Sequence, residues 1–192
     1  VVTRQVERDF GPALASQLGR DMSSVLTIKL GDGHAISYNL HTMDQAGLWQ
    51  GGFLNLKGTQ HYRERGESVP EIQGKMIEGL QTWQWAHEGT FDFPRWQNHP
   101  RGPMPEKWMR YDGHYLHGNR VALSYSINKR KIMEMPAKAG GFGAIIQTLR
   151  VGPGARPLIL AVAKLGNDDA GRGFLGFKAP TVKLERTAKG NI

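Results

Sequence analysis

Hydrophobic and polar residues alternate most regularly between Trp108 and Pro136. Two turn signals, His117-Gly118-Asn119 and Asn128-Lys129, divide this stretch into three short runs. The middle run, residues 120–127, has apolar side chains at every second position, which is the period of a half-buried strand. These apolar positions are Val121, Leu123, Tyr125 and Ile127. The stretch therefore predicts a three-stranded antiparallel meander.

A second hairpin is expected near the start of the chain. Residues 24–30 and 34–40 both have strand-like composition, and Gly31-Asp32-Gly33 lies between them. An Asp-Gly pair between two such runs is a strong hairpin signal, because both residues tolerate the positive φ of a tight turn. Residues 53–56 form a further expected strand, and Gly51-Gly52 before it allows a bulge or a close backbone approach.

The last third of the chain predicts more short strands. Residues 144–151 and 157–165 would pair across a Gly-Pro-Gly turn, and residues 174–177 and 181–185 would form terminal edge strands. Short strands joined by short turns are typical of two packed antiparallel sheets. The expected fold is therefore an antiparallel β-sandwich or a jelly-roll-like fold.

Two segments interrupt this pattern. Residues 1–22 are expected to form an N-terminal arm or a short helix, because Pro12 can open a helix over Ala13–Leu18. Residues 58–105 are long, polar and irregular, and their tryptophans indicate that this excursion packs against the sheets or a neighbouring domain. We expect one all-β domain, residues 1–192, with a minor α part and one long irregular insertion.

Composition narrows the functional classes. The chain has no cysteine, which excludes disulfides, thiolate metal sites and C-x-x-C-H haem attachment within it. No apolar run approaches the roughly 20 residues needed to span a bilayer. The formal net charge of +8 favours anionic partners such as acidic polysaccharide. Nucleic acid is disfavoured, because the basic residues are not interleaved with aromatic ones. The densest basic cluster, residues 129–131, falls at an expected hairpin tip, where solvated charge is ordinary.

The tryptophans are the first candidates for ligand binding. Flat rings stack on the faces of sugars, and Trp83 and Trp85 would project to one side of an extended segment. Trp49 could join them in a carbohydrate platform. The competing interpretation is that all three rings serve packing in the core or against a neighbouring domain.

Histidines and carboxylates are the second set of candidates. A lyase or hydrolase site could be drawn from His41, Asp44, His61 and His87. His114 and His117 have an odd spacing that puts them on opposite faces of a strand, so no metal site is expected from them. A glycosidase needs two carboxylates at a suitable distance, and the sequence carries no motif for such a pair. The single carboxylates with glycine or aromatic neighbours are Asp32, Asp44, Asp92 and Asp112.

Several motifs resemble one known family. The run Trp49-Gln50-Gly51-Gly52-Phe53-Leu54 resembles its W-x-G-G-F-L element. The stretch from Trp108 to Tyr125 resembles a second element of that family, W…Y-x-G-x-Y-x-H-G-x-x-V-x-L-S-Y. The end of the meander, Ile132 to Pro136, resembles the ending of that element in the family. Phe142 and residues 148–153 resemble the strand that follows it in the family.

The family is an uncharacterised domain on the N-terminal side of large secreted or periplasmic bacterial proteins. Many of these proteins also carry a sugar-dehydrogenase-like β-propeller and a c-type cytochrome domain, and some carry carbohydrate-binding or hydrolase-like modules. The resemblance implies export, contacts with neighbouring domains of the same polypeptide, and any haem or quinone cofactor in those domains rather than in this chain. It implies no catalytic residue.

Three functional hypotheses follow. The leading one is an accessory, non-catalytic domain of a multidomain exported redox or carbohydrate-processing protein, whose parent could be a dehydrogenase. The second is a carbohydrate-binding module for an acidic glycan, with ligand contacts from Trp49, Trp83, Trp85, His41, Asp44 and His87. The third is a polysaccharide lyase or hydrolase domain.

Overall fold

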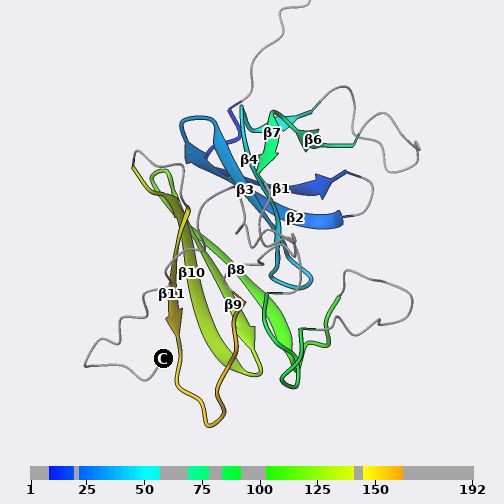
Figure 1. The fold of residues 1–192 in the computed structure, drawn as a ribbon, viewed down its shortest axis with the longest axis vertical. Coiled ribbons are helices and arrows are strands. Elements are labelled where there is room, and N and C mark those ends of the chain that lie inside the picture. Colours follow the sequence, from blue (N-terminus) through cyan, green and yellow to red (C-terminus); the bar gives the residue numbers. More distant parts are fainter. Residues whose placement is uncertain are drawn as a thin grey trace, which may run out of the picture.

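Two antiparallel sheets form the fold (Figure 1). The computed structural model describes residues 9–19, 22–56, 69–77, 84–91, 103–140 and 145–161. Within these residues the regular structure is all strand, with no helix. A five-stranded sheet has the order β1-β2-β3-β4-β7, a four-stranded sheet has the order β11-β10-β9-β8, and β5 and β6 form a small ribbon. The predicted all-β, antiparallel, sandwich-like fold is confirmed.

The first sheet contains the predicted N-terminal hairpin. β2 and β3 are joined by a tight turn in which Asp32 and Gly33 have φ values of 47° and 70°. The Asp-Gly pair thus supplies the positive φ values that such a turn requires. The strands are β1 (Ala13–Leu18), β2 (Met22–Gly31), β3 (His34–Asn39), β4 (Gln45–Gln50) and β7 (Lys75–Ile77).

The first sheet is covered on both faces. All six residues of β3 are buried. Its inner face packs on the second sheet through Leu26, Ile28, Ile36 and Tyr38. On its far face, Val25, Ala35 and Trp49 form a second core with Leu18 and Leu54. The ribbon of β5 (Leu54–Asn55) and β6 (Glu71–Ile72) contributes to that covering layer.

Close backbone packing explains the Gly-Gly motif beside this layer. Gly51 and Gly74 have φ values of +120° and +122°, which L-residues with side chains rarely adopt. A Cβ on Gly74 would overlap the carbonyl group of Gln50. The carbonyl oxygen of Gly33 accepts hydrogen bonds from the N–H groups of Gly51 and Gly52, at 2.9 and 3.1 Å. The motif is therefore needed for the fold.

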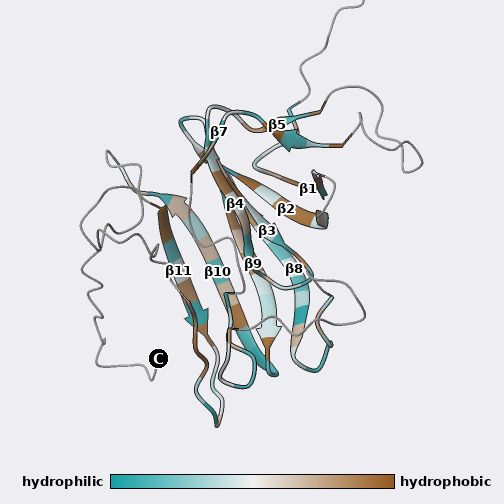
Figure 2. Cartoon of the chain, turned by 45° about the vertical axis from the view of Figure 1, so that its right-hand side comes forward, coloured by the Kyte–Doolittle hydropathy of each residue, from teal (hydrophilic) through white to brown (hydrophobic). Residues whose placement is uncertain are grey.

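The second sheet contains the predicted meander. Its strands are β8 (Met109–His117), β9 (Arg120–Ile127), β10 (Arg130–Lys138) and β11 (Ile145–Val151). The four predicted apolar positions of β9 are all buried. Asn128 and Lys129 form the turn to β10, with φ values of 47° and 65°. Figure 2 shows both hydrophobic and hydrophilic residues along β11, and its exposed and half-buried positions alternate, as expected of a strand with one face toward the interior.

The predicted helix over Ala13–Leu18 is wrong. These residues form β1 and pair with β2, beginning with Ala13 opposite Ile28. The carbonyl group of Pro12 accepts a hydrogen bond from the N–H of Lys29, at 2.8 Å. A helix this short has little stability of its own, so pairing with the sheet edge decides the conformation.

Three further expectations need correction. Sequence patterning missed β4, and it missed β7, which lies inside the segment 58–105 that was predicted to be irregular. The described part of the predicted strand 157–165 does not pair with β11. Instead Leu160 forms a bridge with Trp85, because this segment covers the core from another side. The predicted edge strands 174–177 and 181–185 lie outside the described residues.

Candidate functional site

The predicted tryptophan platform is not presented at the surface. The Trp49 side chain is fully buried, and its indole N–H donates to the carbonyl oxygen of Phe53 at 2.8 Å. Trp85 is 3% exposed, and its indole N–H donates to the hydroxyl of Tyr125 at 3.2 Å. Both rings therefore pack within the protein, and a sugar could not stack on them without displacing the surrounding core. Trp83 lies outside the described residues.

The predicted histidine and carboxylate candidates take part in local contacts. Asp44 accepts a hydrogen bond from the backbone N–H of Gln84 at 2.5 Å, which links it to the segment that carries Trp85. The carbonyl group of His41 accepts from the N–H of Met104 at 3.2 Å. His87 meets Trp108 edge-to-face, with ring centroids 4.8 Å apart. His61 and Asp92 lie outside the described residues.

No metal centre is evident among the residues that the structure describes. No group of three His, Asp or Glu side chains there is arranged to hold a metal ion. Of the two histidines considered above, His114 instead makes a 2.7 Å hydrogen bond with the hydroxyl of Tyr111. The same described ranges contain no helix that is long and apolar enough to cross a membrane.

A buried carboxyl group between the sheets was not predicted. Glu134 of β10 has no exposed surface. It accepts hydrogen bonds from the Tyr125 hydroxyl and the Gln147 side-chain amide, both at 2.6 Å. The sequence held a signal for this site, because Glu134 occupies the inward phase of the alternation set by Ile132. A charged residue in the apolar phase of a strand marks a buried polar site.

Burial raises the pKa values of the ionisable side chains around Glu134. It raises the pKa of Glu134, although the hydrogen bonds that the carboxyl accepts from Tyr125 and Gln147 oppose the shift. Burial and the neighbouring Glu134 carboxyl raise the pKa values of Tyr38 and Tyr125 well above their usual range. Both tyrosines therefore keep their protons at neutral pH. The cluster acts as an internal polar tie between β9, β10 and β11, in a core where unpaired groups are costly.

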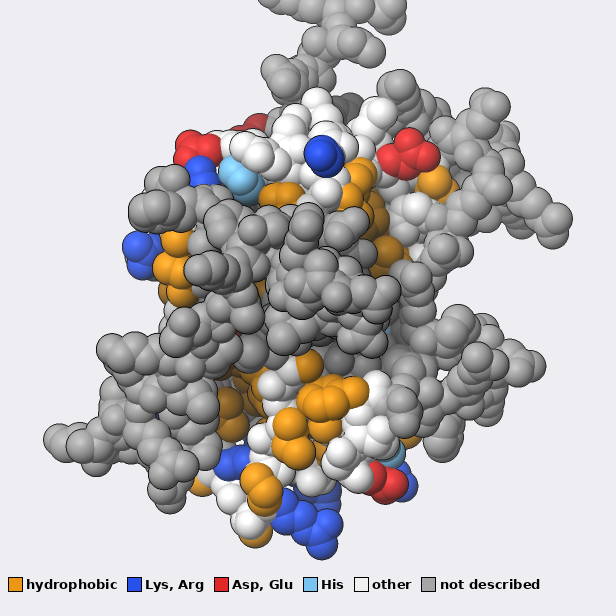
Figure 3. All heavy atoms as spheres, in the orientation of Figure 1, with side chains coloured by type: hydrophobic (Ala, Val, Ile, Leu, Met, Phe, Trp, Pro, Cys, Tyr) orange, Lys and Arg blue, Asp and Glu red, His pale blue; other side chains and the backbone are white. Residues whose placement is uncertain are grey.

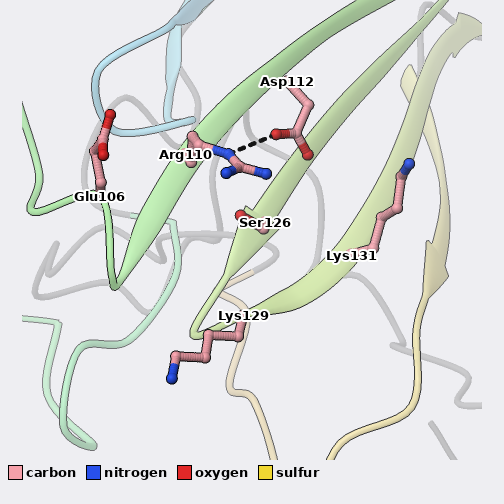
Figure 4. Close-up of a pocket in the computed structure, with 6 residues that line it drawn as sticks. All are labelled: Glu106, Arg110, Asp112, Ser126, Lys129 and Lys131. Carbon is pink, nitrogen blue, oxygen red and sulfur yellow. Dashed lines mark hydrogen bonds and ion pairs between the residues drawn. The ribbon is translucent and has the colours of Figure 1, made fainter.

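The outer face of the second sheet carries a charged pocket of about 410 Å³ (Figure 4). We call it the outer pocket. Arg110 of β8 and Lys131 of β10 both pair in register with Ser126 of β9, so these three residues share one face. The Arg110 guanidinium donates to Asp112 at 2.8 Å. The residues lining the pocket are Glu106, Arg110, Asp112, Ser126, Lys129 and Lys131.

The basic cluster at the hairpin tip divides into two roles. Arg130 is anchored, because its guanidinium donates to the carbonyl groups of Gly152 and Arg156, at 3.1 and 2.9 Å. Lys129 and Lys131 line the outer pocket and make no ion pair with any described residue. Arg130 is therefore not an ordinary solvated charge, contrary to the prediction from the sequence. Lys129 and Lys131 remain beside a concave surface.

The same outer face carries an apolar strip beyond the pocket. We call it the outer strip. At the two edges of the sheet, Tyr115 is 59% exposed and Ile146 is 49% exposed. Between them the face is filled by half-buried side chains. Figure 3 views the molecule from one side and shows hydrophobic side chains at the surface in both its upper and its lower half. By register and alternation the same face also carries Ser124, Thr148 and Arg150, and the apolar residues that make up the outer strip are Tyr115, Ala122, Met133, Met135, Ala137 and Ile146.

A second cavity, of about 570 Å³, lies where the two sheets meet. Its lysines are already neutralised. Lys29 pairs with Asp9 at 3.0 Å, and Lys138 pairs with Asp32 of the β2–β3 turn at 2.5 Å. These hydrogen bonds lower the pKa values of both aspartates. These ion pairs link the N-terminal segment to β2, and the β2–β3 turn to β10.

These features define an all-β domain of two packed sheets, with one sheet enclosed and the other open on its outer face. The chain belongs to the DUF6797 family, which is described as a domain of unknown function. It matches this family over residues 36–134, just over half of its length and the whole run from β3 into β10. No curated protein and no solved structure matches the chain.

Proposed function

We propose that this chain is an accessory, non-catalytic domain of a multidomain exported redox or carbohydrate-processing protein. In this proposal it packs against a neighbouring domain of the same polypeptide, a β-propeller or a cytochrome, through the outer strip. Haem or quinone chemistry would belong to the neighbour. The motif resemblance supports the domain context, and the exposure of the outer strip carries the proposal of contact.

The outer strip has the composition of a contact surface. The outer face of an antiparallel sheet is usually polar when it faces water. Here large apolar side chains stand exposed at both edges, Tyr115 on β8 and Ile146 on β11, with Met133 and Met135 between them. Contiguous exposed apolar surface commonly marks an interaction site, and Tyr and Met are enriched in interfaces.

The alternative sites for sugar binding and catalysis have less support. A platform built on Trp49 and Trp85 would need two buried rings to become exposed. Asp44 is engaged with the backbone of Gln84. An acidic glycan would therefore meet this chain at another place, and the outer pocket has the charges for it.

Association in trans tests the proposal. The chain should bind the remainder of its parent polypeptide, measured by isothermal titration calorimetry, and Tyr115→Asp should weaken that binding at least about ten-fold, since it buries a charge in an apolar contact. Phe91→Asp is the matched control, because Phe91 is also exposed, at 42%, but lies outside the outer strip.

Two outcomes would contradict the proposal. The first is the absence of association, or an equal loss in the Phe91 variant. The second is turnover of a polysaccharide by the purified chain alone, because an accessory domain has no such activity.

A further inference from the structure

We propose that the outer pocket binds the carboxylate and neighbouring hydroxyl groups of a uronic acid in an acidic saccharide. This site is distinct from the outer strip, since none of its lining residues belongs to the strip. Binding there does not require the docking proposed above.

The first argument is the supply of uncompensated positive charge. Lys129 and Lys131 make no ion pair with any described residue, whereas Arg110 already has Asp112 as a partner. Figure 4 shows Arg110 on β8 and Lys131 on β10 to either side of Ser126, Lys129 in the β9–β10 turn, and both lysine side chains extending away from the serine. Because lysine side chains are long and rotatable, they can turn toward a carboxylate placed over Ser126, which could then accept charge-assisted hydrogen bonds from them and one from the hydroxyl.

The second argument is that the cations are held at a defined spacing. Arg110 and Lys131 lie in register on opposite sides of Ser126, two strand spacings apart, or about 10 Å between backbones. Their long side chains can therefore reach a group above the central strand from both sides. The rigid sheet keeps the two stems in place, which reduces the ordering needed on binding.

The third argument is the presence of carboxylates in the same pocket. Glu106 and Asp112 would repel a sulfate, which has no hydrogen-bond donor at neutral pH, and a phosphate, which has at most two. Sugar hydroxyl groups donate to carboxylates, so a uronic acid satisfies both halves of the lining. The volume of about 410 Å³ lies within the range of about 300–1,000 Å³ typical of small-molecule sites.

Titrations with an acidic saccharide and with two reference ligands test whether the outer pocket binds a uronic acid. We would titrate the chain with tetragalacturonate, with its methyl ester and with inorganic phosphate, using calorimetry at low and moderate salt. Tetragalacturonate should bind, its uncharged methyl ester should bind about ten-fold more weakly or not at all, and added salt should weaken the acid form. Lys131→Gln should reduce tetragalacturonate affinity about ten-fold. Lys75→Gln, an exposed lysine on β7 in the first sheet, is the matched control and should leave affinity unchanged.

Asp112→Asn separates a saccharide site from a bare anion site. It should weaken tetragalacturonate, because the carboxylate that accepts from its hydroxyl groups is replaced by a weaker, neutral amide acceptor, and strengthen phosphate, since a negative charge is removed and Arg110 is released. The proposal is overturned if tetragalacturonate fails to bind, or if Lys75→Gln weakens it as much as Lys131→Gln does. It is also overturned if Asp112→Asn strengthens both ligands, because the pocket would then be a general anion site. Tyr115→Asp should leave saccharide binding intact, so failure of the docking proposal and failure of this one are distinguishable.

Discussion

The two sheets differ in what covers them. The first sheet has cores on both faces, and β3 at its centre is buried along its whole length. Among the residues that the structure describes, the second sheet packs its inner face against the first, and its outer face carries exposed Tyr115 and Ile146. In the first sheet, therefore, the unusual residues serve packing. In the second, the outer face combines an apolar strip with a charged pocket that the fold does not use.

This difference indicates where function should be sought. The Gly-Gly motif and Trp49, which look suggestive in the sequence, are accounted for by close packing beside the first sheet. The outer-face residues are not needed to complete either core. Substitutions in the two regions should therefore have different effects. Those in the first sheet should lower stability, and those on the outer face of the second sheet should weaken binding.

The largest effect is expected at Gly74. In Gly74→Ala the new Cβ would collide with the Gln50 carbonyl at a backbone φ of +122°. The free energy of unfolding should fall by about 3 kcal/mol or more, measured by urea denaturation. Gly113→Ala in β8 is the control, since its φ is +132° but nothing lies within 4 Å. It should cost about 1 kcal/mol from backbone strain alone. Equal losses would show that the close packing is unimportant.

The polar tie between β9, β10 and β11 should give the next largest effect. Tyr125→Phe removes the donor to Glu134 and the acceptor of the Trp85 indole N–H. Stability should fall by about 2 kcal/mol, because buried polar groups are left unpaired. Tyr115→Phe, on the exposed face, should change stability by less than about 0.5 kcal/mol. If the two variants denature alike, Glu134 is not held as the structure indicates.

Glu134 should also make stability depend on pH. Its pKa is raised in the folded protein from an ordinary value of 4.5. Its stabilising contribution is therefore complete below about pH 4.5 and is lost as the pH rises through the folded pKa. Glu134→Gln stays neutral, and Gln147 can turn its amide to match it. The difference in unfolding free energy between wild type and variant should thus decline as the pH rises above about 4.5. A flat difference would contradict a raised pKa.

The smallest effect on stability is expected on the outer face. Tyr115→Ser and Lys131→Gln should each change the free energy of unfolding by less than about 0.5 kcal/mol, because both side chains lie at exposed positions of the sheet. Thermal denaturation measures this directly. A loss of 2 kcal/mol or more in either variant would place these residues in the folding core, contrary to the comparison of the two sheets.

The sequence predicted those parts of the fold whose information is local. The β2–β3 and β9–β10 hairpins are specified by Asp-Gly and Asn-Lys turns and by period-two alternation. The helix prediction at Ala13–Leu18 failed because Pro12 was taken as a helix start, whereas the segment forms a hairpin with the next strand, in which Leu18 lies opposite Met22. The β4–β7 pair was missed because a long excursion separates its two strands in the chain.

The candidate site was harder to predict than the fold. The conspicuous tryptophans could equally fill a core, and burial decided the matter for Trp49 and Trp85. The outer pocket depends on register across three strands, which puts Arg110 and Lys131 on either side of Ser126. Residues this far apart in the chain carry no spacing signal.

Hydroxyl-radical footprinting tests the central claim most directly. The outer strip contains Tyr115, Met133 and Met135, whose side chains react readily with such radicals, and Met22 of β2 provides an internal reference on the first sheet. Oxidation would be compared by mass spectrometry between the chain alone and the chain within its parent polypeptide. We predict that the three outer-strip residues are oxidised in the chain alone and protected in the longer protein, while Met22 reacts equally in both. Equal oxidation of the outer strip in the two samples would contradict the account.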